Sequence, residues 1–312
     1  MAEIVVSEFM EEGAVADLAA AFSLLYDPGL ADRPEELRRR LGEARALIVR
    51  NRTRVDRALL AAAPRLRVIG RLGVGLDNID LEACREHGVV VRPAAGANAG
   101  AVAEYVIGTA LLLLRDLAGA TARLLAGEWP REAFVGRELA GKTLGLLGYG
   151  RIARAVARRA AALEMPIAAH DPHIAPEDPA WRGVQRLPLE ELLATADILS
   201  LHLPLTPETR GLLDARRLAR MKQGAVLIDT ARGGILDEAA LVRALRAGRL
   251  AGAALDVFEE EPLSAETAAR FRGLPNLILT PHIAGVTVES NRRVSQVTAD
   301  NVRRLLTSAD GA

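Results

Sequence analysis

The chain has 312 residues, and its 40 lysines and arginines balance its 40 aspartates and glutamates. Zero net charge argues against a nucleic-acid partner, because nucleic-acid-binding proteins usually carry an excess of basic residues. Hydrophobic residues make up 50% of the chain, enough to form the buried cores of two domains. A single cysteine excludes an internal disulfide and a cysteine-rich metal site. The start of the chain resembles no signal sequence, and the longest lipid-like stretch, Tyr105 to Leu114, is too short for a membrane span. We therefore expect a cytoplasmic protein.

The first third of the chain alternates short apolar runs with helical patterns, which predicts a parallel sheet. The expected strands are Ile4–Phe9, Ala46–Arg50, Arg67–Leu72 and Val89–Arg92, with helices such as Pro34–Leu41 and Val55–Ala62 between them. A long helix should then run from Ala101 to about Leu117. Its broad apolar surface suits an interdomain element or a subunit interface.

A second alternating series follows. Its expected strands are Thr143–Leu147, Ile167–His170, Ile198–Leu201, Ala225–Asp229, Ala251–Leu255 and Leu277–Thr280. Helices such as Arg151–Ala162 and Glu238–Arg246 lie between them, and a last helix, Val286–Leu306, should return to the first domain. The pattern predicts an α/β protein with two doubly wound parallel-sheet domains, in which residues 99–285 are inserted between residues 1–98 and 286–312.

A glycine-rich turn marks a cofactor site in the inserted domain. The strand Thr143–Leu147 runs into Gly148-Tyr149-Gly150-Arg151-Ile152-Ala153, and a helix follows, as in the dinucleotide-binding fingerprint. Asp171 ends the next strand about 20 positions after Gly150, where an acidic residue accepts the hydroxyls of the adenine ribose. Such a carboxylate repels a 2′-phosphate, which favours NAD over NADP. The alternative is that Asp171 merely opens an Asp-Pro turn.

Three consecutive strands deliver chemically useful side chains to one edge of the predicted sheet. Arg232 follows Ala225–Asp229, Glu261 follows Ala251–Leu255, and His282 follows Leu277–Thr280. An imidazole can take the proton of an alcohol near neutral pH, and a carboxylate beside it favours the resulting imidazolium. An arginine can bind a substrate carboxylate through two parallel hydrogen bonds.

These segments resemble the D-isomer-specific 2-hydroxyacid dehydrogenases, with motifs closest to 3-phosphoglycerate and sulfolactate-type dehydrogenases. The likeness extends over nearly the whole chain and includes residues 73–80, 98–104, 141–145 and 202–206. It implies that His282 is the acid/base, that Glu261 orients it and that Arg232 holds the substrate. It also implies a Rossmann NAD domain inserted into a flavodoxin-like substrate domain, without the regulatory domain of some relatives, and a homodimer formed through the NAD domains. Arg131 could then reach a neighbouring site.

The resemblance extends to further binding residues. For the cofactor it implies contacts from Gly148, Tyr149, Gly150, Arg151, Ile152, Asp171, His202, Pro204, Thr209, Thr230, Ala231, Arg232, Asp256, His282, Ala284 and Gly285. For the substrate it implies Arg50, Val74, Gly75, Asn98, Arg232 and His282. No metal is expected, because His170 and His173 have no further ligands grouped with them.

The expected reaction is hydride transfer between NAD(H) and C2 of a small 2-hydroxy or 2-oxo acid. By the same resemblance, Arg50 favours a substrate with a second anionic group at C3, as in phosphoglycerate or sulfolactate; the alternative is that Arg50 is a surface arginine. A glyoxylate or hydroxypyruvate reductase is the alternative within this class. An alternative of another class is an NAD(H)-sensing protein similar to corepressors of the same superfamily, which keep similar catalytic residues.

Overall fold

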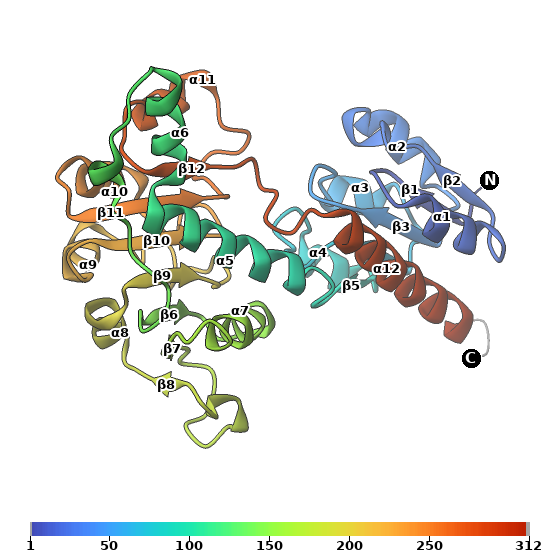
Figure 1. Cartoon of the computed structure of the whole chain (residues 1–312). Coiled ribbons are helices and arrows are strands. Elements are labelled where there is room, and N and C mark those ends of the chain that lie inside the picture. The colour runs from blue at the N-terminus through green and yellow to red at the C-terminus, as the bar shows by residue number, and fades with distance from the viewer. Residues whose placement is uncertain (1, 310–312) are drawn as a thin grey trace. The chain divides into compact units, whose positions relative to one another are not determined.

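The structure, a computed structural model, describes residues 2–309; residues 1 and 310–312, which the sequence assigns to the first domain, lie outside the described residues. The chain divides into two compact units, residues 1–98 with 286–312 and residues 99–285. Each unit is a parallel sheet with helices packed against it (Figure 1). The predicted α/β class is therefore confirmed. Within the described part of the chain, no helix is both long and apolar enough to cross a bilayer.

The first unit, hereafter unit 1, has a five-stranded sheet in the order β2-β1-β3-β4-β5, the order of flavodoxin-like folds. The alternation of strand side chains gives it two cores. Val5, Leu47 and Ile69 face α2, α3 and α4, whereas Ile4, Ile48 and Val68 face α1 and α12. The strands are β1 Ile4–Val6, β2 Leu24–Tyr26, β3 Ala46–Val49, β4 Val68–Arg71 and β5 Val90–Pro93; the helices are α1 Glu12–Ala19, α2 Pro34–Arg40, α3 Arg57–Ala61, α4 Leu81–Glu86 and α12 Val288–Ala309.

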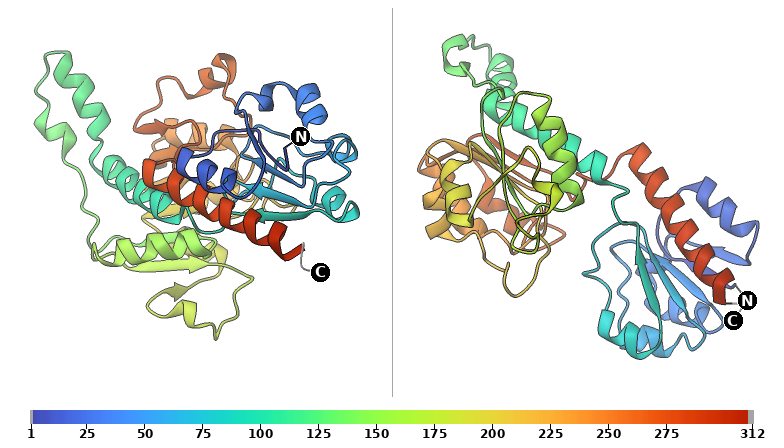
Figure 2. Two further views of the ribbon diagram at one scale, coloured as in Figure 1. Left: turned by 90° about the vertical axis from the view of Figure 1, so that its right-hand side faces the viewer. Right: turned by 90° about the horizontal axis from the view of Figure 1, so that it is seen from below.

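The second unit, hereafter unit 2, has a seven-stranded sheet in the order β12-β11-β10-β9-β6-β7-β8, which extends the Rossmann order by one strand. Helices α5 and α7 pack on one face (Figure 2), and α8, α9 and α10 pack on the other. The strands are β6 Leu144–Leu147, β7 Ile167–His170, β8 Gln185–Arg186, β9 Ile198–Leu201, β10 Ala225–Asp229, β11 Leu250–Leu255 and β12 Leu277–Leu279; the helices are α5 Ala99–Arg115, α6 Leu117–Leu125, α7 Arg151–Ala161, α8 Leu189–Thr195, α9 Ala215–Arg220, α10 Glu238–Arg246 and α11 Ala265–Ala268.

The predicted long helix differs most from the structure. It ends at Arg115, because Asp116 has a left-handed conformation with φ 45° and caps a second helix, α6, through the amide of Gly119. The prediction of one helix to Leu117 missed this break. The sequence reading also missed the short strands β2 and β8, and the predicted strand to Phe9 ends at Val6, beyond which Phe9 is half exposed.

Candidate active site

The register of unit 2 brings the ends of three strands together. β10, β11 and β12 are adjacent and parallel, with Asp229 paired to Leu255 and Leu255 paired to Leu279. The loops that follow these strands carry Arg232, Glu261 and His282, so all three begin at the carboxyl edge of the sheet. This edge is where ligands bind in open α/β sheets.

Glu261 and His282 are in direct contact. The Nδ1 atom of His282 lies 2.8 Å from the Oε2 atom of Glu261, and the Phe258 amide donates to Oε1 at 3.0 Å. Burial raises the pKa of Glu261, but the hydrogen bonds from His282 and Phe258 outweigh it, and the net shift is downward. The carboxylate is therefore ionised near neutral pH, so Nδ1 is the donor and Nε2 is left for another partner. The His282 side chain is 42% exposed.

The His282 backbone is left-handed, with φ 56°, and a second set of contacts holds it there. The His282 amide donates to the Asp256 carbonyl at 2.9 Å. The buried Asp256 carboxylate accepts hydrogen bonds from the Thr280 hydroxyl at 2.6 Å and from the Ile283 and Ala284 amides at 2.7 and 2.8 Å. The Tyr105 hydroxyl lies 2.6 Å from that of Thr280. Asp256 thus fixes the loop on both sides of the imidazole.

Arg232 lies in a tight turn after β10. Its guanidinium donates to the Ala231 carbonyl at 2.5 Å, and its positive charge helps to lower the pKa of Glu261. The neighbouring Gly233 packs on the Phe258 backbone so closely that a Cβ would lie 1.7 Å from the Phe258 carbonyl oxygen. The arginine turn and the glutamate loop are therefore packed directly on each other.

Asp229 lies beneath the Arg232 turn and is almost completely buried. Its carboxylate accepts the Ala231 amide at 2.9 Å. Burial is the main cause that raises its pKa, to about 7, and the charge of Glu238 adds to this, against the hydrogen bond from Ala231. The carboxyl group is therefore protonated in much of the folded protein below pH 7.

The glycine-rich turn has the geometry that a pyrophosphate needs. Gly148 has φ 85°, and a Cβ there would lie 2.7 Å from the His202 carbonyl oxygen. Gly150 is the N-cap of α7 and has no side-chain cap, and apart from its chain neighbours no described residue has an atom within 4 Å of a Cβ built on it. The open backbone at the positive end of an eleven-residue helix is suited to a phosphate group.

Two buried polar atoms at the same edge of the sheet fit a bound dinucleotide. The Thr230 hydroxyl and Nδ1 of His202 have no hydrogen-bond partner within residues 2–309, although buried polar atoms are ordinarily paired. Burial lowers the pKa of His202 to about 3, so its ring stays neutral and can accept or donate one hydrogen bond. His202 follows β9 and Thr230 follows β10, so both side chains begin at the carboxyl edge of the sheet. A ligand bound at that edge could supply their missing hydrogen bonds.

Asp171 joins the glycine turn to the next loop. Its carboxylate accepts the Tyr149 amide at 2.9 Å and the His173 amide at 3.0 Å. The Tyr149 ring is buried and stacks on Trp181, with ring centroids 5.1 Å apart. Tyr149 can therefore contact a cofactor through its backbone only.

The other predicted cofactor residues occupy the same edge. The Thr209 hydroxyl donates to the Pro204 carbonyl at 2.7 Å and so stabilises the turn between these two residues. Ala231 and Ala284 are buried, and Arg151 is exposed at the start of α7. Ile152, partly buried, follows it in the same turn of helix, and Gly285 follows Ala284.

The predicted substrate residues Arg50, Val74, Gly75 and Asn98 belong to unit 1. The Arg50 guanidinium donates to Asn291 at 3.1 Å. Val74 is exposed in the turn after β4 and precedes Gly75, and the Asn98 Oδ1 atom is buried without a hydrogen-bond partner in the described chain. The other two predicted substrate residues, Arg232 and His282, belong to unit 2.

A buried carboxylate that the sequence reading did not single out fixes the Arg50 loop. Glu8, which is 3% exposed, accepts the backbone amides of four consecutive residues at 2.7–3.2 Å: Arg50, Asn51, Arg52 and Thr53. Charge-assisted hydrogen bonds of this kind are among the stronger ones in proteins. The signal was an acidic residue just after a buried strand, where the neighbouring parallel strand also ends.

Comparison with known proteins identifies the family. Residues 107–284 match the model of the "D-isomer specific 2-hydroxyacid dehydrogenase, NAD binding domain". The chain is 55% identical to an (S)-sulfolactate dehydrogenase of Chromohalobacter salexigens, over 98% of this chain and 99% of that protein. It is 40% identical to a D-3-phosphoglycerate dehydrogenase of Methanocaldococcus jannaschii over 98% of this chain, but spans only 58% of that protein.

A solved structure agrees with this. D-lactate dehydrogenase from Aquifex aeolicus, complexed with NAD and lactic acid, superposes with a TM-score of 0.85 and 30% identity, over 98% of this chain and 96% of that one. The protein belongs to the D-isomer-specific 2-hydroxyacid dehydrogenase family. It is an NAD-dependent oxidoreductase, and the predictions of family, reaction class and cofactor are confirmed.

Proposed function

We propose that the protein interconverts a 2-hydroxy acid carrying a second anionic group at C3 and the corresponding 2-oxo acid, with His282, Glu261 and Arg232 as its catalytic residues. Sulfolactate is the first candidate substrate. The observation that carries the catalytic assignment is the 2.8 Å contact between Glu261 and His282 at the carboxyl edge of β11 and β12. The substrate rests on the 55% identity to an (S)-sulfolactate dehydrogenase over nearly the whole of both chains.

In this proposal each of the three side chains has a step of its own. NAD, when bound, would supply the redox chemistry, as the acceptor of a hydride from C2 during oxidation and as its donor during reduction. Nε2 of His282 takes the hydroxyl proton during oxidation and delivers it to the carbonyl oxygen during reduction. The Glu261 carboxylate stabilises the imidazolium through Nδ1. Arg232 binds the substrate carboxylate and so orients C2.

The cofactor is held, in this proposal, by the predicted residues of unit 2. The α7 amides and Gly150 bind the pyrophosphate, Asp171 binds the adenine ribose, and the buried polar atoms of Thr230 and His202 receive cofactor hydrogen bonds. Unit 2 is thus the NAD-binding domain and unit 1 the substrate-binding domain.

We also propose that the protein is cytoplasmic. Cys84, the only cysteine, is free and buried, which is typical of proteins in a reducing compartment.

The substrate is tested by the oxidation of NADH with sulfopyruvate, phosphohydroxypyruvate, hydroxypyruvate and glyoxylate. We expect the largest kcat/KM with sulfopyruvate. A preference for hydroxypyruvate or glyoxylate would instead make the protein a reductase of monoanionic oxo acids, and no turnover of any of them would favour an NAD(H)-sensing role.

The role of Arg50 has a matched control in the same loop. Arg50→Gln should raise KM for sulfopyruvate about tenfold or more and change KM for glyoxylate little, because one charge-assisted contact to the C3 group is lost. Arg52→Gln, in which the removed guanidinium is half exposed and paired with Asp32, should leave both values unchanged. Equal effects of the two variants would remove Arg50 from the substrate site.

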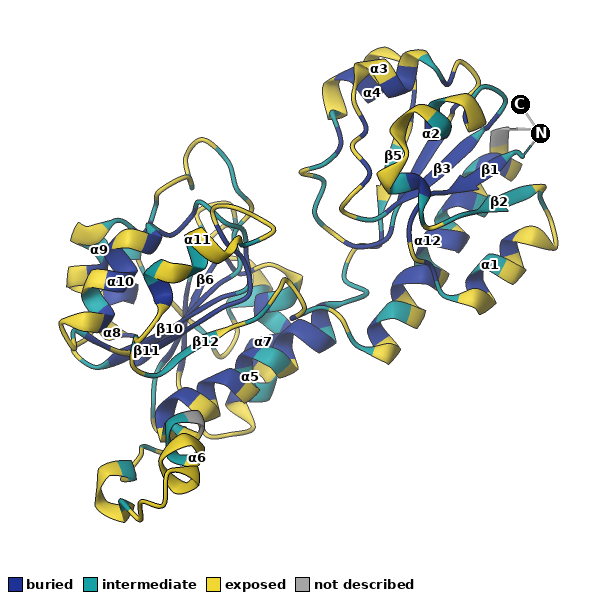
Figure 3. Cartoon of the chain, turned by 90° about the horizontal axis from the view of Figure 1, so that it is seen from above, coloured by how far each residue is buried: buried dark blue, intermediate teal, exposed yellow. Residues whose placement is uncertain are grey.

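We further propose that the protein is a homodimer formed through unit 2. The α6 segment, residues 117–137, projects from unit 2 (Figure 2) and is largely exposed (Figure 3). Its most exposed large apolar residues are Leu125, Trp129 and Val135, at 83–85%. Large apolar side chains gathered in one exposed segment support an interaction site there, and Leu111 and Leu112 of the preceding helix α5 are exposed as well.

A second copy of the chain is the expected occupant. Sedimentation at micromolar concentration should give a dimer, and Leu125→Glu together with Trp129→Glu should shift it to a monomer. Leu163→Glu, at an exposed apolar position outside the segment, should leave the dimer intact. In such a dimer Arg131, within the segment, would be placed to reach the neighbouring copy. A monomeric wild-type protein would contradict the proposal.

A further inference from the structure

We propose that Glu238 and Arg270 are positioning residues of the reaction, which fix residues 258–261 so that the Glu261 carboxylate stays on His282. Neither residue touches His282 or Glu261 through a hydrogen bond in the described structure; both act through the loop between them. The inference rests on the proposed roles of Glu261 and His282.

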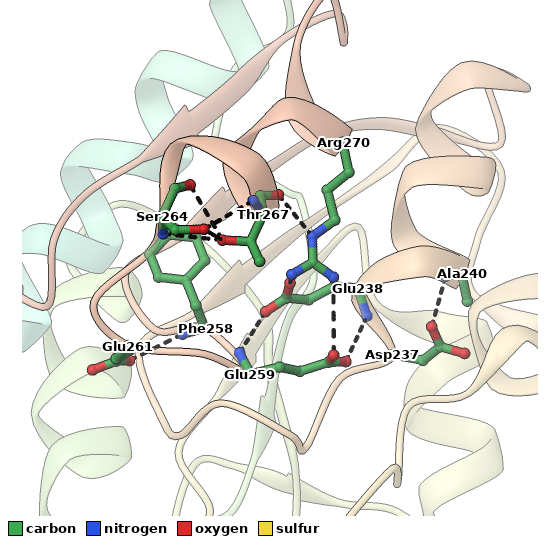
Figure 4. Close-up of polar contacts among 9 residues, drawn as sticks. All are labelled: Asp237, Glu238, Ala240, Phe258, Glu259, Glu261, Ser264, Thr267 and Arg270. Atoms are coloured by element: carbon green, nitrogen blue, oxygen red, sulfur yellow. Dashed lines mark hydrogen bonds and ion pairs between the residues drawn. The ribbon is translucent and has the colours of Figure 1, made fainter.

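Glu238 is a buried carboxylate that holds the loop by its backbone (Figure 4). It is the first residue of α10, its side chain is 3% exposed, and its Oε1 atom accepts the Glu259 amide at 2.6 Å. In return, the Glu238 amide donates to the Glu259 carboxylate at 3.3 Å. The start of α10 and the loop after β11 are thus joined by two reciprocal hydrogen bonds.

Arg270 supplies the positive charge that this buried carboxylate requires. Its Nη2 atom lies 3.2 Å from Oε2 of Glu238, and its Nη1 atom lies 4.0 Å from the Glu259 carboxylate. Its Nε–H donates to the Thr267 carbonyl at 3.0 Å. The capping box of Ser264 and Thr267 fixes this part of the chain (Figure 4). Arg270 is therefore held in place by the local structure around α11.

The same loop carries the Glu261 side chain. The Phe258 amide donates to Oε1 of Glu261, and Phe258 itself packs edge-on against Phe271, with ring centroids 6.1 Å apart. The Arg270 guanidinium lies 5.4 Å from the centre of the Phe271 ring. Glu238 therefore holds the backbone of residue 259, and Phe271 packs on the ring of residue 258. Both contacts restrain the short loop that carries the Glu261 side chain.

A contribution to stability alone does not explain why Glu238 and Arg270 are charged. Buried ion pairs are often no more stabilising than apolar residues of the same volume, so stability alone gives little reason for a charged pair here. A charge-assisted hydrogen bond to the Glu259 amide does, however, restrict the loop more than a neutral contact. Such restriction matters where a carboxylate must be held at hydrogen-bond distance from an imidazole.

The test is a double-mutant cycle between Glu238→Gln and Glu261→Gln. We expect Glu238→Gln to lower kcat about tenfold and to move the falling limb of the pH profile for oxo-acid reduction to lower pH, and we expect the same direction of shift for Glu261→Gln. The reason is that a displaced carboxylate no longer favours the imidazolium. In the Glu261→Gln background the second change should lower kcat no further, because its effect passes through Glu261. Arg270→Lys, which keeps the charge but loses the planar fork, should produce the same shift in smaller measure.

Asp197 provides a matched control in the same unit. Its carboxylate also pairs with a cation, Lys222 at 2.7 Å, and accepts a backbone amide, that of Thr143 at 2.9 Å, but at the amino edge of the sheet. Asp197→Asn should reduce stability and leave the pH profile unchanged.

Two outcomes separate this inference from the proposed function. Glu238→Gln that folds and gives the wild-type pH profile, or losses in kcat that multiply in the double variant, would overturn the inference while Glu261→Gln still impairs the enzyme. If Glu261→Gln itself has no effect on kcat, the proposed function fails first. If Glu238→Gln does not fold, Arg270→Lys with an unchanged pH profile overturns the inference in its place.

Discussion

The Phe258 carbonyl oxygen lies 1.7 Å from the place that a Cβ on Gly233 would occupy. No side chain fits there, so the turn after β10 and the loop after β11 are packed backbone to backbone. One of these segments carries Arg232 and the other carries Glu261. The spacing between a proposed substrate anchor and a proposed proton-relay carboxylate therefore depends on one glycine.

Gly233→Ala should consequently impair both stability and catalysis. Forcing a methyl group into this contact should cost about 1–3 kcal/mol of unfolding free energy, and kcat should fall because the two loops separate. Urea denaturation and NADH oxidation measure the two effects. Gly42→Ala is the matched control: it lies in the turn after α2, where a Cβ would meet only the Arg39 carbonyl oxygen, at 4.0 Å, and it should change stability by less than about 1 kcal/mol. A Gly233→Ala variant as stable and active as the control would contradict this packing.

The preference for NAD should depend on Asp171. Asp171→Asn keeps an acceptor for the Tyr149 amide but removes the charge that repels a 2′-phosphate. We expect the ratio of kcat/KM with NADPH to that with NADH to rise about tenfold or more. Asp178→Asn, the same charge change at the cap of the 3₁₀ turn 179–181 in the following loop, should leave the ratio unchanged. An unaltered ratio in Asp171→Asn would place the ribose elsewhere.

The buried Asp229 should make stability depend on pH. Burial raises its pKa to about 7, so between about pH 4 and 7 the folded state binds a proton that the unfolded state has lost, and stability falls as pH rises through this window. Asp229→Asn cannot ionise and escapes this loss. Relative to wild type, its unfolding free energy should rise by about 2–3 kcal/mol from pH 5 to pH 8.

Asp197→Asn is the control for this measurement, because the pKa of Asp197 is lowered by folding whereas that of Asp229 is raised. Burial raises the pKa of Asp197, but the hydrogen bonds from Lys222 and Thr143 outweigh it and the net pKa is lowered. Its stabilisation is therefore complete above the unfolded pKa and is lost only as pH falls below it. Asp197→Asn should be less stable than wild type by a constant amount between pH 5 and 8. If Asp229→Asn behaved in the same way, Asp229 would be ionised throughout.

Much of the fold, and the strand ends that carry the candidate site, could be predicted because the local signals agree with the global structure. Strands such as β6 and β10 are buried on both faces and appear as continuous apolar runs. The strand, glycine turn and helix around Gly148 have a known geometric purpose. Because β10, β11 and β12 are adjacent and parallel, the segments that follow them begin at one edge of the sheet, as the sequence predicted for Arg232, Glu261 and His282.

The features that were missed depend on contacts between distant parts of the chain. β2 has three residues and exists because it pairs with β1, while Asp116 interrupts the predicted long helix through a single backbone angle. Glu8 contacts amides more than 40 positions away, and Tyr105 reaches Thr280 across 175 positions. No local pattern specifies these partners; only the packed structure brings them together.

The proposed role of His282 is tested most directly by its replacement with asparagine, which tolerates the left-handed backbone at this position better than alanine would. NADH binding is followed by fluorescence, and kcat is measured with the best oxo acid of the panel. We predict that NADH binding is retained and that kcat falls by about 10²–10⁴, the usual contribution of a positioned acid or base. A folded Asn variant with wild-type kcat would show that the imidazole beside Glu261 does not carry the proton.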